Sequence, residues 1–217
     1  MSKQDKAKAR RAKKNKQIIY MMLAASLVVV AVMGFNIIRI SLKKSAGSGE
    51  VVEKTNTSSM KNDQYVIGNN PTQFQQDEFK KLTEALKGDD PLAISEAVVR
   101  NFIADYFTWT NKDGNYEVGG LQYIYGPMFT SFQEQSRWEF YKDLDLYISQ
   151  YGRENLLEVT DITTTANYAA KFEHYSGDVY DAYYIEASWN YKASSKIDVD
   201  DFQKTGYFTV VNNGGRY

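Results

Sequence analysis

The chain has 217 residues, a hydrophobic fraction of 43% and a formal net charge of −1, values that suit one globular domain with short accessory segments. It contains no cysteine and a single histidine, His174. This composition excludes disulfide frameworks, thiolate nucleophiles and zinc sites that depend on cysteine or on several histidines. We therefore expect neither a cofactor nor a bound metal.

The near-zero net charge hides two regions of opposite sign. Residues 1–16 contain eight Lys or Arg and one acid, whereas residues 45–217 contain 15 basic and 26 acidic residues, a formal charge of −11. An apolar segment separates the two regions. Opposite charges on the two sides of an apolar run are typical of a membrane protein.

The apolar segment is residues 18–38 (IIYMMLAASLVVVAVMGFNII), which carry no charge. As a helix these residues would span about 31 Å, close to the ~30 Å hydrocarbon core of a bilayer. A cleaved signal peptide is the alternative, but the run is longer than a signal's apolar region and Arg39, Lys43 and Lys44 follow it. The segment predicts a retained transmembrane helix.

The basic residues before this segment predict the orientation. By the positive-inside rule, residues 1–17 form a basic cytoplasmic tail and the acidic remainder lies outside the cell membrane. Residues 39–70 contain mainly polar and small residues without sustained periodicity, so we interpret them as a flexible linker. Residues 71–217 then form one extracytoplasmic domain.

The first half of this domain has helical patterns. Residues 71–88 place Phe79, Leu82 and Leu86 on one face, and residues 91–110 begin with Asp90 as a cap and Pro91 at the first helical position. Residues 126–152 predict one short helix and one longer helix. The longer helix has a mixed apolar face formed by Trp138, Tyr141, Leu144 or Asp145, and Ile148, and Gly152 ends it.

The second half changes to the period-two pattern of strands. Four β-branched and aromatic stretches indicate strands at residues 156–163, 167–175, 179–193 and 206–213. In the third stretch, Tyr183, Ile185, Ala187, Trp189 and Tyr191 alternate with polar residues, which predicts one buried and one exposed face. The sequence therefore predicts an α+β domain in which helices pack on a curved antiparallel sheet of about four strands.

Three segments carry a resemblance to a known family: the apolar run at 18–38, the helix PLAISEAVVRNFIADYFTW and the strand VYDAYYIEASWNY. In its architecture the chain resembles the bitopic inner-membrane assembly factor of type IV secretion, the eighth VirB component, in its Gram-positive conjugation form. The resemblance implies a fold like nuclear transport factor two, a curved sheet holding a cone of helices. It also implies a scaffold role in a conjugative DNA-transfer machine.

The same cone-shaped fold also contains enzymes that place a carboxylate base beside Tyr or His. Asp105, Asp161, Glu173 and His174 are the candidates here, but the sequence does not bring them into one pocket, and a structural or surface role is favoured for His174. A buried cavity with a convergent carboxylate and tyrosine would favour an enzyme. An interior filled by Trp109 and Phe102 would favour a scaffold. We expect no catalysis, and we interpret the acidic cluster at residues 198–201 as a solvated turn.

Tyrosine is abundant in the second half of the chain. Tyrosine is enriched at protein interfaces, although these rings would equally well cover a small sheet. The candidate interface residues are Tyr123, Tyr125, Tyr180, Tyr183, Tyr184 and Tyr191. Because a domain with a formal charge of −11 repels phosphate, we expect no direct binding of nucleic acid.

These features predict a single-pass membrane scaffold that associates with itself and with other subunits of a conjugative type IV secretion channel. Its partners would be further copies of the chain, the other channel subunits and the bilayer. The alternatives are a membrane-tethered ligand-binding or enzymatic domain of the same fold, and a sporulation or cell-wall accessory protein.

Overall fold

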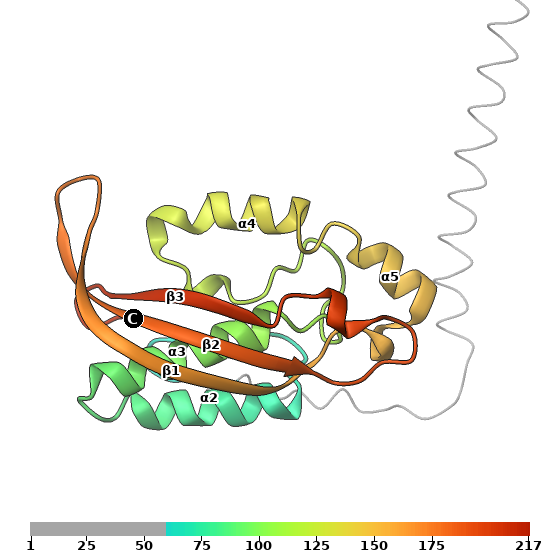
Figure 1. Ribbon diagram of the computed structural model, residues 1–217, viewed down its shortest axis with the longest axis horizontal. Coiled ribbons are helices and arrows are strands. Elements are labelled where there is room, and N and C mark those ends of the chain that lie inside the picture. Colours follow the sequence, from blue (N-terminus) through green and yellow to red (C-terminus); the bar gives the residue numbers. More distant parts are fainter. Residues whose placement is uncertain (1–59) are drawn as a thin grey trace, which may run out of the picture. The chain divides into compact units, whose positions relative to one another are not determined.

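The computed structural model describes residues 60–217, which belong to one compact unit that extends from Asn56 to Tyr217. The predicted cytoplasmic tail, the predicted transmembrane helix at 18–38 and most of the predicted linker lie outside the described residues. Within residues 60–217, four α-helices precede an antiparallel sheet, so the predicted α+β class is confirmed (Figure 1). None of the helices in this part of the chain is both long and apolar enough to cross a bilayer.

The folded unit begins before Pro71, which corrects the predicted end of the linker at residue 70. Residues 60–67 form a small turn in which the Ile67 N–H donates to the Met60 carbonyl (2.8 Å). The turn buries Tyr65, whose ring lies 4.9 Å from that of Tyr123 and whose hydroxyl donates to the main-chain oxygen of Tyr217. Residues 60–70 therefore belong to the domain, because Tyr65 ties them to its C-terminal end.

Replacing Tyr65 with phenylalanine is expected to lower the free energy of unfolding by about 1 kcal/mol, because the ring packing remains and one buried hydrogen bond is lost. Urea unfolding followed by tryptophan fluorescence measures this change, since all three tryptophans lie within the described residues. The exposed Tyr207 provides the control, and Tyr207→Phe should leave the midpoint unchanged. Equal midpoints for the two variants would show that the hydrogen bond from Tyr65 to Tyr217 does not stabilise the domain.

The first two α-helices begin as the sequence predicts. Helix α2 (Gln73–Ala85) has Thr72 as its N-cap, and Thr72 forms a reciprocal capping box with Gln75. Helix α3 (Pro91–Tyr106) has Asp90 as its N-cap, with Pro91 in the first turn. Helix α3 ends four residues before the predicted residue 110, because the N–H groups of Trp109 and Thr110 donate to the Leu157 carbonyl instead of continuing the helix.

The region between α3 and the sheet differs from the prediction in its helix boundaries. Two short 3-10 turns, η1 (Leu121–Tyr123) and η2 (Gly126–Met128), lead into α4 (Phe129–Trp138), and α5 (Leu144–Tyr151) follows. The predicted long apolar helix is therefore interrupted at 139–143. The reason is tertiary: Tyr141 points inward, its hydroxyl donates to the Tyr106 carbonyl (2.5 Å), and Trp138 remains exposed. Gly152 ends α5, as predicted.

The sheet has the order β1-β2-β3, formed by β1 (Val159–Glu173), β2 (Val179–Tyr191) and β3 (Thr205–Asn212). The predicted strands at 156–163 and 167–175 are the two halves of β1, which a register shift between Ala166 and Tyr168 joins. The sheet in the described residues therefore has three strands rather than about four. The sequence predicted a break between residues 163 and 167, but at this position the strand continues through an irregularity of the β-bulge type.

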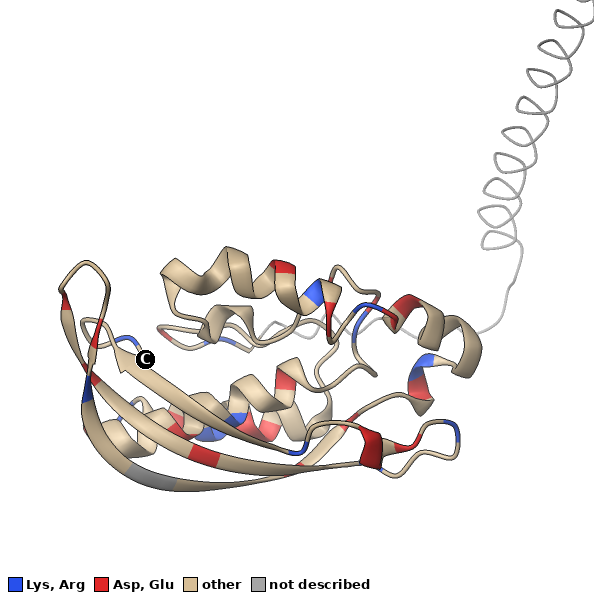
Figure 2. Cartoon of the chain, turned by 45° about the horizontal axis from the view of Figure 1, so that its top comes forward, with Lys and Arg blue, Asp and Glu red and all other residues tan. Residues whose placement is uncertain are grey.

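Strand β2 confirms the predicted alternation. Its odd-numbered residues from Ile185 to Tyr191 are buried and the even-numbered residues between them are exposed. The buried face packs on α3, where the rings of Phe107 and Trp189 lie 4.3 Å apart. The strands curve around the helices (Figure 2). A 3-10 turn, η4 (Val199–Asp201), connects β2 to β3.

Candidate functional site

A groove of about 920 Å³ lies beside the outer strand β3. Its floor is α3, with Val98, Val99 and Phe102, and one wall is the continuous stretch 206–211 of β3. The segment from η1 to the first half of α4 forms the other wall. Figure 1 shows α4 running alongside β3, and residues of both elements line the groove. The rim includes the exposed side chains of Met128, Phe129 and Tyr207.

Two glycines allow the η1 segment to lie against α3. A Cβ atom at Gly119 would lie 2.3 Å from the main-chain oxygen of Asp105, and Gly120 has a φ of 71°, which disfavours any other residue. The sequence shows these glycines in the loop after α3. Because η1 begins at Leu121, the close contact of these two glycines with α3 determines where this wall of the groove lies.

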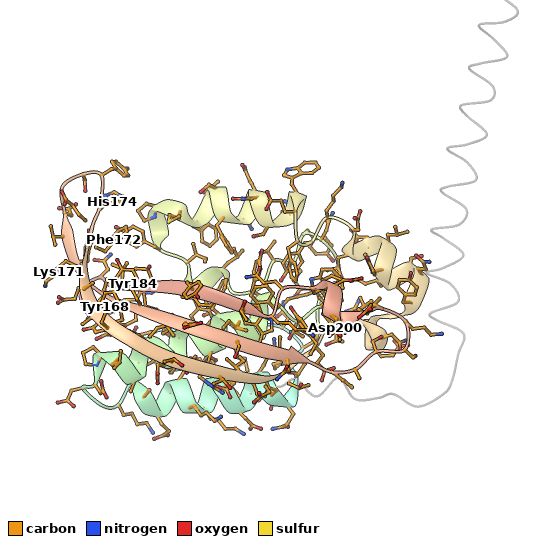
Figure 3. The ribbon with its side chains drawn as sticks, viewed as in Figure 1. Tyr168, Lys171, Phe172, His174, Tyr184 and Asp200 are labelled. Carbon is orange, nitrogen blue, oxygen red and sulfur yellow. The ribbon has the colours of Figure 1, made fainter. Side chains whose placement is uncertain are left out.

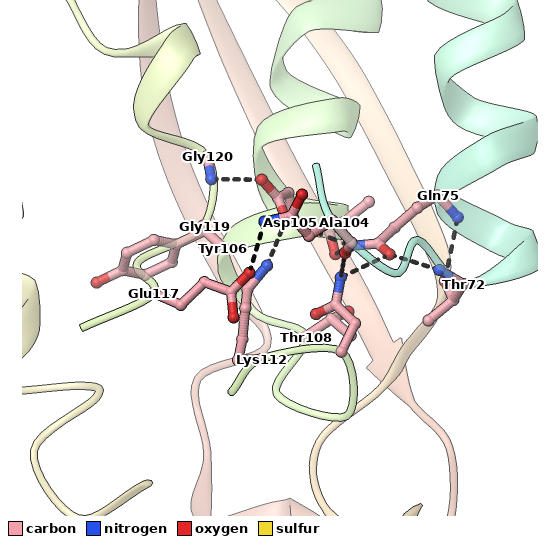
Figure 4. A network of polar contacts seen from close by, with 12 residues as sticks. Thr72, Gln75, Ala104, Asp105, Tyr106, Thr108, Lys112, Glu117, Gly119 and Gly120 are labelled. Atoms are coloured by element: carbon pink, nitrogen blue, oxygen red, sulfur yellow. Dashed lines mark hydrogen bonds and ion pairs between the residues drawn. The ribbon is translucent and has the colours of Figure 1, made fainter. Parts of the chain in front are cut away.

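A buried polar network lies behind this wall (Figure 4). Asp105, in the last turn of α3, accepts hydrogen bonds from the Lys112 ammonium (2.5 Å) and from the Gly120 N–H (2.7 Å). Lys112 is only 3% exposed, so this ion pair is almost completely removed from water. The Gln75 side chain continues the network, since its amide nitrogen donates to the Ala104 carbonyl (3.1 Å) and its amide oxygen accepts from Asn111 (3.1 Å).

Two tyrosines lie close to this carboxylate. Burial, with a further contribution from the negative charge of Asp105, raises the pKa of Tyr123 and of Tyr141 far above the usual value. Both phenols therefore stay protonated. The Tyr141 hydroxyl donates to the Tyr106 carbonyl and accepts from the Gly119 N–H (3.1 Å), so its hydrogen-bonding capacity is used within the domain.

The network connects the segments of the domain and leaves little capacity for chemistry. Both oxygens of the Asp105 carboxylate already accept hydrogen bonds, and the residue is not among those that line the groove. The interior is filled by side chains that include Trp109 and Phe102, both buried. The arrangement fits a structural clamp that fixes the end of α3, the following loop and η1.

The other candidate catalytic residues are not brought together. Asp161 is exposed on β1 beside Asn190, and Glu173 and His174 lie at the far end of the β1–β2 hairpin, where His174 contacts Ser176 (2.8 Å) (Figure 3). In the acidic turn, Asp198 accepts from the Asp200 N–H (3.0 Å). No group of three potential metal ligands occurs within residues 60–217.

The six candidate interface tyrosines are divided among four places. Tyr123 and Tyr125 line the groove, and Tyr180 packs against Tyr125 at a ring distance of 6.1 Å. Tyr184 lies on the outer face of the sheet, 5.1 Å from the ring of Tyr168 (Figure 3).

Tyr183 and Tyr191 lie on the inner face of β2. Tyr183 is half-buried beside Tyr217, at a ring distance of 6.3 Å. Tyr191 is buried, and its hydroxyl donates to the Gln203 carbonyl (2.8 Å). Tyr191 is therefore a core residue, which corrects its assignment to an interface. The alternating pattern of β2 had already predicted that Tyr191 lies on the buried face of the strand.

The sequence patterns did not indicate a functional role for two segments that define the groove, β3 and the start of α4. Two weak signals were present in the sequence. Strand β3 contains no charged residue, and Met128 and Phe129 are apolar residues that do not belong to a periodic apolar face of a helix. Comparisons with protein-family models, curated proteins and solved structures find no match for this chain.

Proposed function

We propose that the protein is a membrane-anchored assembly subunit of a conjugative type IV secretion system. The single observation that carries this proposal is the apolar groove beside β3, which is a surface suited to another protein chain. The uncharged run at 18–38 supports the membrane anchor. The helices that cover one face of a curved antiparallel sheet agree with the fold like nuclear transport factor two that the family resemblance implies.

In this proposal the domain acts by tethering rather than by catalysis. The anchor confines the domain to a membrane surface, so that several weak contacts add up through a high effective concentration. The groove supplies one contact surface for channel subunits, and the exposed tyrosines of the sheet supply another for self-association. The acidic charge of the domain argues against direct binding of the transported DNA.

Conjugation tests the function. In donor cells whose transfer machinery includes this chain, deletion is expected to abolish DNA transfer, and the full chain should restore it. The groove variant Phe129→Asp should restore transfer about tenfold less well or worse, because it places a charge in an apolar contact.

The matched control is Trp138→Asp, since Trp138 lies on the same helix, is 77% exposed and does not line the groove. This variant should restore transfer fully. Normal transfer from the deletion strain would overturn the proposal.

The orientation has its own test, because the chain has no native cysteine. Tyr175 is 93% exposed at the tip of the β1–β2 hairpin, so Tyr175→Cys should react with a membrane-impermeant maleimide on intact cells. A cysteine at Ser2 should react only after the cells are opened. The reverse pattern would contradict an extracytoplasmic domain.

A second function, a membrane-tethered ligand-binding domain, is favoured by the size of the groove. Its volume of about 920 Å³ is in the range of small-molecule sites, and most of its lining is apolar. Native mass spectrometry of the purified chain tests this alternative. A small molecule bound in stoichiometric amount to the wild type but absent from Phe129→Asp would favour ligand binding over assembly.

A further inference from the structure

The outer edge of β3 has main-chain groups that make no hydrogen bond to any other residue within 60–217. The Trp189 N–H donates to the Lys204 carbonyl (2.8 Å), and this bond fixes which residues of β3 face β2. Because bonding alternates along an antiparallel pair, the even-numbered residues of β3 bond to β2 and the odd-numbered residues point away from it. Among the described residues, the main-chain N–H groups of Tyr207, Thr209 and Val211 have no hydrogen-bond acceptor.

This free edge opens into the groove. All residues from Gly206 to Val211 line it, including those that point away from β2. Six residues of extended strand cover about 20 Å. The edge therefore offers a strand-length row of donors and acceptors inside an apolar cleft.

Only one of the two edge strands of the sheet has features that disfavour pairing with other chains. Strand β1 has a bulge between Ala166 and Tyr168 and carries Asp161, Lys171 and Glu173, which are features that disfavour edge-to-edge pairing. Strand β3 has no bulge, no proline and no charged residue, and it appears uniformly tan in Figure 2. Tyr207, on this uncharged strand, is 81% exposed. An edge without protection is expected where pairing is used.

The geometry points to β-strand addition: we propose that an extended segment of a partner protein inserts between β3 and α4 and pairs with the outer edge of β3. This inference rests on the proposed assembly function, because it names the kind of contact that the groove makes. Main-chain bonds to Tyr207, Thr209 and Val211 provide affinity, and the side chains of alternate partner residues enter the apolar groove.

The surroundings of the edge determine the chemistry of the segment. Its inward side chains would meet Phe102, Phe132 and Phe208, so they are apolar. Among the described residues that line the groove, Arg216 alone carries a charge, and it lies at the end where β3 finishes. The segment therefore carries a carboxylate at that end. The first half of α4 lines the groove opposite β3, and α4 runs alongside that strand (Figure 1). This arrangement suits one inserted strand better than a whole second copy of the domain paired edge to edge.

The test uses the full chain in detergent and a phage-displayed library of random linear dodecapeptides. Peptides are selected on the wild type and counter-selected on Thr209→Pro. The Thr209 N–H points away from β2, so proline removes an edge donor without breaking the bonds to β2. The control is Thr209→Val, which keeps the N–H group. Tryptophan-fluorescence melting verifies that both variants fold.

We expect selected peptides with alternating apolar residues and a terminal acid. Thr209→Val should bind a synthetic selected peptide as the wild type does, and Thr209→Pro should bind it about tenfold less tightly or worse. Arg216→Gln should weaken binding of the selected peptide, but it should not change binding of a control peptide in which the terminal Asp or Glu is replaced by Asn or Gln. In the wild type, the bound peptide should slow hydrogen exchange at the amides of Tyr207, Thr209 and Val211, a measurement that does not depend on the folding of any variant.

The inference is overturned if no peptide is enriched on the wild type over Thr209→Pro, or if the selected peptides leave those three amides unprotected. Self-pairing of β3, seen as protection of the same amides at high protein concentration without peptide, would overturn it in favour of a second copy. Each result is separate from the transfer assay. If deletion of the chain abolishes transfer but no peptide binds to β3, the assembly function is retained and only this contact is rejected.

Discussion

Replacing Arg100 with alanine is expected to lower the free energy of unfolding by about 3–5 kcal/mol. The Arg100 guanidinium donates to both oxygens of the Glu78 carboxylate, at 2.6 and 2.8 Å, and to the Ile162 carbonyl at 2.6 Å. Glu78 is only 1% exposed. Without Arg100 this carboxylate remains inside the protein with Lys81 as its remaining charged partner, and the link from α2 and α3 to β1 is lost.

Urea unfolding of the full chain in detergent, followed by tryptophan fluorescence, measures the loss. The control is Lys80→Ala, which removes an exposed ion pair with Asp77 on α2, the helix that carries Glu78, and should change the midpoint little. The double variant Glu78→Leu/Arg100→Leu should be more stable than Arg100→Ala, because it leaves no buried charge. If Arg100→Ala unfolds at the midpoint of Lys80→Ala, the ion pair does not support the fold.

The same pair predicts a dependence on pH. Burial alone would raise the pKa of Glu78, but the hydrogen bonds from Arg100 and Lys81 prevail and hold this pKa below the usual value. The unfolded chain therefore takes up this proton at a higher pH than the folded chain. The stabilisation from Glu78 is complete above about pH 4.5 and is lost as the pH falls through the folded value, so Glu78→Gln should flatten the loss of stability in acid.

Replacing Asp105 with alanine is the second change with a large expected effect, again about 3–5 kcal/mol. Lys112 would lose its partner while remaining almost fully buried, and the Gly120 N–H would lose its acceptor. Because this network fixes the start of η1, the groove wall should loosen as well. Hydrogen exchange at residues 119–123 is expected to accelerate in this variant even under conditions where the domain stays folded.

The control is Asp113→Ala, which breaks a partly exposed ion pair with Arg153 and should cost less than about 1 kcal/mol. The double variant Asp105→Leu/Lys112→Met should regain part of the stability, since an apolar pair of similar volume replaces the buried charges. A loss for Asp105→Ala no greater than for Asp113→Ala would show that the network does not clamp the loop.

Local signals predicted the parts of the fold that local physics controls. Asp90 with Pro91 marked the start of α3, Gly152 marked the end of α5, and the alternation from Tyr183 to Tyr191 marked the buried face of β2. Each of these features depends on residues within a few positions of one another. Capping, a positive φ and period-two burial need no information from the rest of the chain.

The candidate site was harder to predict, because long-range contacts define it. Asp105 and Lys112 are close in sequence, but their burial depends on Gln75 and Gly120, which come from other segments. The groove requires α4 to stand apart from β3, and nothing in either segment alone specifies that spacing. Of the six tyrosines proposed for an interface, two line the groove and one belongs to the core.

By itself, the sequence determined the charge asymmetry, the exclusion of cysteine chemistry, the α+β class and the starts of α2 and α3, since composition and short-range patterns carry this information. Only the tertiary structure decided that Tyr65 belongs to the domain, that Tyr141 interrupts a helix, and that the outer edge of β3 faces an apolar groove. The physical reason is that burial and hydrogen-bond partners depend on segments that are distant in the chain, and these meet only when the whole domain packs.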